Sequence, residues 1–87
     1  MGYFRNEMPV YSREQGFDMV IYYDATNRTE YVGIAIPGTL TSEAKWSIYK
    51  LYYGVTSEQV EKRRYAGGSD AFDKIMDSYT TYNYLDI

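Results

Sequence analysis

Residues 17–36 have the sequence FDMVIYYDATNRTEYVGIAI, in which two runs of β-branched and aromatic residues flank a short polar segment. Such runs favour extended strands, and the polar residues 24–28 are typical of a turn. In the first run, alternation places Phe17, Met19, Ile21 and Tyr23 on one face, and Val20 and Tyr22 on the other. The sequence therefore predicts a β-hairpin with strands at 17–24 and 29–36.

Residues 44–53, AKWSIYKLYY, alternate in the same way after a break at Pro37-Gly38 and a loop of small hydroxyl residues. One face of this expected strand carries Trp46, Ile48, Lys50 and Tyr52, and the other carries Tyr49, Leu51 and Tyr53. Because an antiparallel sheet needs only one apolar face, bulky residues on both faces predict that something covers the second. A second packed layer, the carboxy-terminal segment and another subunit are the candidates.

The last third of the chain predicts a polar strand at 58–66, a break at Gly67-Gly68, a short helix and a final strand at 80–87. The helix is expected because Phe72, Ile75, Met76 and Tyr79 follow the spacing i, i+3, i+4, i+7, with Ser69 or Asp70 as its cap. The expected fold is mainly β: a small antiparallel β-sandwich or barrel-like sheet with one short helix near residues 70–78.

The chain divides into two parts. Residues 1–16 have scattered hydrophobic side chains without a period, and we expect a flexible N-terminal arm that is either disordered or ordered on a neighbouring subunit. Residues 17–87 suit a single β domain, because so short a chain cannot form two cores. The expected core consists of Phe17, Met19, Ile21, Ile34, Trp46, Ile48, Val60, Phe72, Ile75 and Met76.

Composition argues against several classes of function. The chain has no histidine and no cysteine, which excludes the usual triads, thiolate chemistry and zinc sites, so we expect no enzyme, no cofactor and no metal. Helix capping and a solvated face account for Asp70, Asp73 and Asp77. A net charge of −3 argues against nucleic-acid binding, and the apolar runs are too short for a membrane span.

Tyrosine, present twelve times, suits half-buried protein contacts because its ring is large and its hydroxyl tolerates water. The candidate interface residues are Tyr49, Leu51, Tyr53, Tyr82 and Tyr84. An alternative is that Trp46 and the nearby tyrosines form a stacking platform for a carbohydrate. We favour a core role for Trp46.

Residues 31–50, YVGIAIPGTLTSEAKWSIYK, resemble a small family encoded by tailed bacteriophages. The shared pattern is Tyr-x-Gly-x-Ala-x-Pro-Gly-Thr-x-Thr-Ser followed by Trp-x-Ile-x-Lys. Residues 65–68 (YAGG), 72–75 (FDKI) and 82–84 (YNY) extend the resemblance to about Tyr31 to Tyr84. The chain departs from the family at residues 76–79, MDSY, where a Trp-Asp-x-Arg run is usual.

The resemblance implies a phage protein with a small β fold and no catalytic residues. We therefore expect a non-catalytic virion structural or adaptor protein of the tail, neck or fibre region, made in the host bacterial cytoplasm and located in the virion. Its expected partners are other virion proteins and further copies of itself. One alternative is a small phage protein that inhibits a host or defence protein. Another is a carbohydrate-binding module that attaches the particle to a host-surface glycan through Trp46.

Overall fold

A computed structural model describes residues 9–14, 16–54 and 59–86. It confirms the prediction of a mainly β, antiparallel fold with one short helix, which is a 3-10 helix. The described elements are β1 (Val10–Glu14), β2 (Phe17–Tyr23), β3 (Thr29–Ala35), β4 (Ala44–Tyr53), β5 (Val60–Ala66), β6 (Lys74–Ile75), η1 (Met76–Thr81) and β7 (Tyr84–Leu85).

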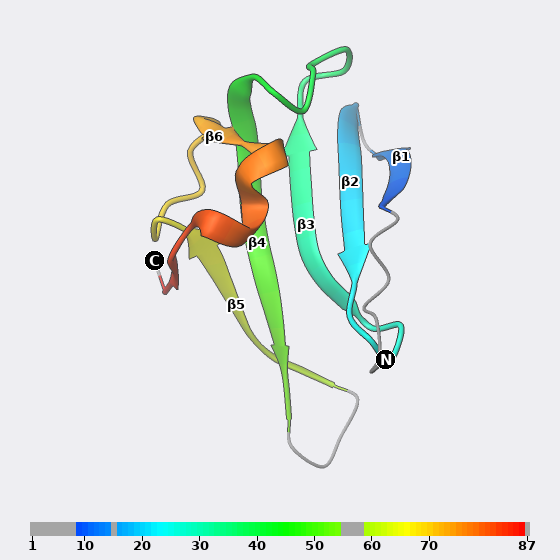
Figure 1. Cartoon of the computed structure of the whole chain (residues 1–87), viewed down its shortest axis with the longest axis vertical. Coiled ribbons are helices and arrows are strands. Elements are labelled where there is room, and N and C mark those ends of the chain that lie inside the picture. Colours follow the sequence, from blue (N-terminus) through cyan, green and yellow to red (C-terminus); the bar gives the residue numbers. More distant parts are fainter. Residues whose placement is uncertain (1–8, 15, 55–58, 87) are drawn as a thin grey trace, which may run out of the picture.

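The strands form one sheet in the order β1-β2-β3-β4-β5-β7, and β6 pairs with the start of β4 (Figure 1). Every pairing is antiparallel. The sheet is not closed into a barrel, and β1 and β7 lie at opposite ends of the strand order. The long strand β4 lies at the centre, between β3 and β5.

The expected hairpin is present as β2 and β3, each one residue shorter than predicted. Its turn is held by the Asp24 carboxylate, which accepts hydrogen bonds from the Thr26 and Arg28 backbone N–H groups, each at 2.9 Å. The guanidinium of Arg28 also donates to this carboxylate, at 3.0 Å. Asn27 has a φ of 65°, in the left-handed region that asparagine tolerates better than most residues.

The main cluster of buried residues lies on one face of the sheet, which we call the covered face. Helix η1 crosses this face in front of β4 (Figure 1) and places Met76 and Tyr79 against it. The strands contribute the buried side chains of Val20, Tyr31, Ala35, Trp46, Ile48 and Ala66. In register, Val20 lies opposite Gly33 and Gly33 opposite Ile48, so these positions share one face.

The predicted core was partly wrong. Trp46, Ile48 and Met76 are buried as expected, but Phe17, Val60 and Phe72 are 36%, 50% and 45% exposed. On β2 the structure buries Val20, at 1% exposure, and none of the predicted odd positions. Met19, Ile21, Ile34 and Ile75 are half-buried. Both faces of β2 are apolar, so alternation alone could not identify the face that η1 covers.

The predicted helix begins later than its spacing indicated. Residues 74–75 form β6, and the 3-10 helix begins at Met76. Ile75 is extended because it pairs with Ala44, and its N–H donates to the Tyr82 hydroxyl at 2.9 Å. The Asp77 N–H donates to the Thr41 carbonyl at 3.0 Å. These tertiary hydrogen bonds replace those of the expected helical turn.

The predicted arm is ordered where the structure describes its middle part. Residues 10–14 form β1, which pairs with β2 from Val10 opposite Ile21 to Glu14 opposite Phe17. An ion pair at 2.9 Å between Arg13 and Asp18 joins the two strands. Residues 1–8 and 15 of the predicted arm lie outside the described residues.

Candidate functional site

The face of the sheet opposite η1, which we call the open face, is also largely apolar. Met19, Ile34 and Ser47 lie side by side on β2, β3 and β4, and Tyr49 lies opposite Tyr65 on β5. Their side chains share this face because strand residues alternate and the covered face takes Val20 and Ile48. Among the described segments, the loop before β6 reaches this face through Phe72.

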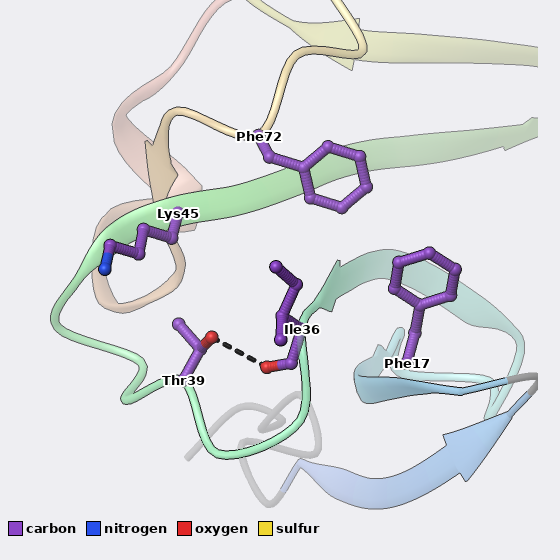
Figure 2. A pocket seen from close by; sticks show the side chains of 5 residues that line it. All are labelled: Phe17, Ile36, Thr39, Lys45 and Phe72. Atoms are coloured by element: carbon purple, nitrogen blue, oxygen red, sulfur yellow. Dashed lines mark hydrogen bonds between the residues drawn. The ribbon is translucent and has the colours of Figure 1, made fainter.

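The first hollow on the open face has a volume of about 330 Å³ and is lined by Phe17, Ile36, Thr39, Lys45 and Phe72. The rings of Phe17 and Phe72 are stacked, with centroids 5.9 Å apart and an angle of 19° between the planes. In Figure 2 the side chains of Ile36, Phe17 and Phe72 surround a common space, whereas the Lys45 amino group points away from the two rings. The Thr39 hydroxyl donates to the Ile36 carbonyl at 2.7 Å and fixes this turn (Figure 2).

A second hollow of about 290 Å³ adjoins the first, since Phe72 lines both. Its other lining residues are Met19, Ile34, Ser47, Tyr49, Arg63, Tyr65 and Asp70. We call the two hollows together the trough. The Arg63 guanidinium lies 4.7 Å from the centre of the Tyr49 ring and donates to the Tyr65 hydroxyl at 3.4 Å. Burial raises the pKa of Tyr49, although the positive charge of Arg63 opposes the change.

The trough combines exposed apolar side chains with charges at its edge. Phe17, Ile36 and Phe72 are 36%, 69% and 45% exposed, and Lys45, Arg63 and Asp70 are the charged residues of its lining. Isolated exposed hydrophobic residues are common, but a contiguous concave group with a polar edge is typical of a binding surface.

The five residues predicted to form an interface do not lie together. Tyr49 lines the trough, and Leu51 and Tyr53 follow it on the same face of β4, where both are half-buried. The Tyr53 hydroxyl donates to the Thr29 carbonyl at 2.7 Å, and the Arg28 guanidinium lies 4.5 Å from the Tyr53 ring centre. Tyr53 therefore links β4 to the β2–β3 turn.

Tyr82 and Tyr84 pack against the core of the covered face. The Tyr82 hydroxyl accepts a hydrogen bond from the Ile75 N–H. The Tyr84 hydroxyl donates to the Tyr79 carbonyl. The centres of the Tyr84 and Tyr31 rings are 5.4 Å apart. Both residues hold η1 against the sheet, and this structural task explains their position.

The trough was not predicted from the sequence. Phe17 and Phe72 were expected in the core, and Ile36 had no expected role. The useful signal was the apolar character of both strand faces, which required a cover or a partner for one of them.

Trp46 is unsuited to stacking on a carbohydrate. Its side chain is 1% exposed, and its indole N–H donates to the Leu40 carbonyl at 2.9 Å. A sugar ring can stack only on an accessible aromatic face, so the structure removes the residue on which that alternative depended.

Within the described ranges, no three histidine, cysteine, aspartate or glutamate residues are grouped so that they could hold a metal ion. In the same ranges no helix has the length and apolar character needed to cross a membrane. No protein-family model, curated protein or solved structure matches the chain.

Proposed function

We propose that the chain is a non-catalytic structural or adaptor protein that binds other proteins through the trough. The observation that carries this proposal is the pair of adjoining apolar hollows around Phe72, on a sheet face that no helix covers among the described residues. The resemblance at residues 31–84 supplies the setting, a component of the tail, neck or fibre of a bacteriophage particle.

Energetic considerations support a protein partner. Fully burying a side chain such as Ile or Phe stabilises a contact by about 1.5–3 kcal/mol, and Phe17, Ile36 and Phe72 have surface left to bury. The stacked phenylalanine rings are already in position, so little side-chain freedom is lost on binding. Lys45, Arg63 and Asp70 at the edge would orient the partner by charge.

The test uses Ile36→Asp, with Leu40→Asp as the matched control. Ile36 lines the trough and is 69% exposed, whereas Leu40 is 65% exposed in the same loop region but does not line the trough. Both variants add one negative charge at an exposed position, so both should fold, as circular dichroism and thermal melting would verify.

The readout is the number of copies per purified phage particle, measured by quantitative mass spectrometry. We expect wild-type protein and Leu40→Asp in equal amounts, and Ile36→Asp reduced by about tenfold or more, because tenfold corresponds to about 1.4 kcal/mol. Absence of the wild-type protein from particles would contradict the virion role. Equal incorporation of the two variants would instead show that the trough is not the contact surface.

A further inference from the structure

The sheet has two long strand edges with no pairing strand among the described residues. One is the outer edge of β1, which stands last in the strand order (Figure 1). The other is the 60–64 part of β5, since β7 pairs only with Tyr65 and Ala66. An unpaired edge offers a row of backbone N–H and C=O groups to any compatible strand.

The two edges differ in how they are protected. The β5 edge carries Glu61, Lys62, Arg63 and Arg64 in succession, and such charges discourage pairing with another strand. The β1 edge begins with Val10 and Tyr11, which are 42% and 66% exposed. Its ladder with β2 runs through five consecutive pairs without a bulge, so β1 presents a regular outer edge.

We propose that β1 pairs with β1 of a second copy of this chain, antiparallel and about a two-fold axis that passes through Ser12. A two-fold axis perpendicular to the sheet is the simplest closed way to join identical edges, because each strand then meets its own copy. It keeps the covered faces of both copies on one side and the open faces on the other.

Charge and backbone chemistry select Ser12 as the centre. An axis at Arg13 would place two guanidinium groups opposite each other, and an axis at Tyr11 would bring Pro9, which has no N–H, into the ladder. An axis at Ser12 uses all five residues of β1 and places Tyr11 opposite the partner's Arg13, twice.

The Arg13 side chain is prepared for this contact. Its Nε is paired with Asp18 at 2.9 Å, while the side chain as a whole is 65% exposed. The ion pair orients the guanidinium and leaves its flat face available to an aromatic ring, the arrangement that cation–π contacts require. A Tyr11 ring from the second copy fits this chemistry.

The resulting dimer is expected to be weak by itself. A ladder of five residue pairs buries less than the roughly 1,200 Å² of a small stable interface, so we expect dissociation constants of about 10 µM to 1 mM. Because the axis leaves both troughs open on the same side, each copy could still bind a partner. The proposed dimer depends only on the β1 edge, so it can be right or wrong independently of the proposed function of the trough.

The first experiment measures mass by light scattering from about 10 µM to 1 mM. We expect the mass to rise from that of the 10.2 kDa monomer toward twice that value. Val10→Glu should weaken the dimer by about tenfold or more, because the Ser12-centred register places residue 10 opposite the partner's Glu14 and like charges repel there, whereas Val60→Glu should not change it. Both valines begin a strand and are 42% and 50% exposed, so the control matches in residue type, place and exposure.

Three results would overturn the β1 pairing. They are a mass that stays monomeric at 1 mM, a limiting mass other than twice the monomer, and equal responses to the two glutamate variants. Melting temperatures of both variants would confirm that each monomer is folded. Ile36→Asp should leave the dimer unchanged, which separates this proposal from the role of the trough.

A second experiment tests the register and uses the absence of cysteine from the chain. Ser12→Cys places two thiols across the axis, where directly opposite Cβ atoms are about 4.5–5.5 Å apart. Oxidation or a short thiol cross-linker at dimer-forming concentrations should give a covalent dimer, and Val60→Cys should remain monomeric. If Ser12→Cys gives no more covalent dimer than Val60→Cys, the Ser12-centred pairing is wrong.

Discussion

Met76 occupies the space that a side chain at Gly33 would need. A Cβ atom on Gly33 would overlap the Sδ of Met76 and lie 3.3 Å from Cε3 of Trp46. Both neighbours are 1% exposed, so neither can move aside into solvent. The missing side chain in the middle of β3 is therefore the reason why η1 can lie so close to the sheet.

Gly33→Ala should accordingly lower the free energy of unfolding by about 1–3 kcal/mol, the usual effect of overpacking a core. In a chain of this length that corresponds to a fall of about 4–8 °C in melting temperature for each kcal/mol. Thermal and urea melts would measure the effect. The control is Met76→Ala. This substitution lowers stability by itself, but it removes the side chain that fills the space beside Gly33. In the double variant Gly33→Ala should cost little, and strictly additive losses would contradict direct contact as the cause.

Protonation of Asp18 should lower the stability of the fold in acid. Its carboxylate accepts the Gly38 N–H at 2.8 Å and pairs with Arg13, and these contacts, the Gly38 bond foremost, hold the pKa of Asp18 below its ordinary value of 3.8. When the pKa of a carboxyl group is lower in the folded protein than in the unfolded chain, the ionised group stabilises the fold. This stabilisation is complete at a pH above the pKa of the unfolded chain, and it is lost as the pH falls through the pKa of the folded protein. The wild-type protein should therefore be more stable than Asp18→Asn at pH 7.

The check is the urea midpoint of both proteins at pH 7 and at about pH 2.5. The advantage of the wild type should shrink at the lower pH, because a protonated Asp18 resembles asparagine in charge. An advantage that is constant with pH would assign the effect to shape and not to ionisation.

Asn27 should respond differently to glycine and to alanine. Its φ of 65° costs a residue with a Cβ atom about 1–2 kcal/mol, and asparagine offsets part of this cost through local hydrogen bonds. Asn27→Ala should therefore lower stability by about 1 kcal/mol, whereas Asn27→Gly should be close to neutral. The melting temperatures of Asn27→Ala and Asn27→Gly test this prediction. Equal losses of stability in the two variants would mean that the turn relaxes out of the left-handed region.

Tyr84 should contribute to unfolding at alkaline pH. Burial is the main cause that raises the pKa of Tyr84 well above its ordinary value of 10.0, and neighbouring tyrosines, Tyr31 first, add to it. A raised folded pKa means that the stabilisation is complete below the unfolded value near 10 and is lost as the pH rises. Part of the alkaline sensitivity of the fold should therefore come from this hydroxyl.

Tyr84→Phe removes the hydrogen bond to the Tyr79 carbonyl and should cost about 0.5–1.5 kcal/mol at pH 7. At pH 11 its stability should approach that of the wild type, because only the wild type has this phenol to ionise. Denaturant melts at both pH values test this prediction, and an undiminished gap at pH 11 would contradict it.

The sequence by itself determined the local features of the fold. Alternation over residues 17–23 and 29–35, together with turn chemistry at Asp24 and Asn27, was enough to predict the β2–β3 hairpin. These features depend on neighbouring residues, which interact in the same way wherever the hairpin is placed. The burial of Trp46 and Ile48 was also predicted, because large apolar side chains at alternate positions favour the interior.

Only the tertiary structure decided which face of β2 belongs to the core and where the candidate site lies. Both faces of β2 are apolar, and Met76 packs against the face on which Gly33, having no side chain, leaves room for it. The trough depends on Phe72 reaching Phe17, a contact between residues far apart in the sequence. Periodicity records which side chains share a face. It carries no information on which distant segment will cover that face, because that is settled by shape and packing between segments.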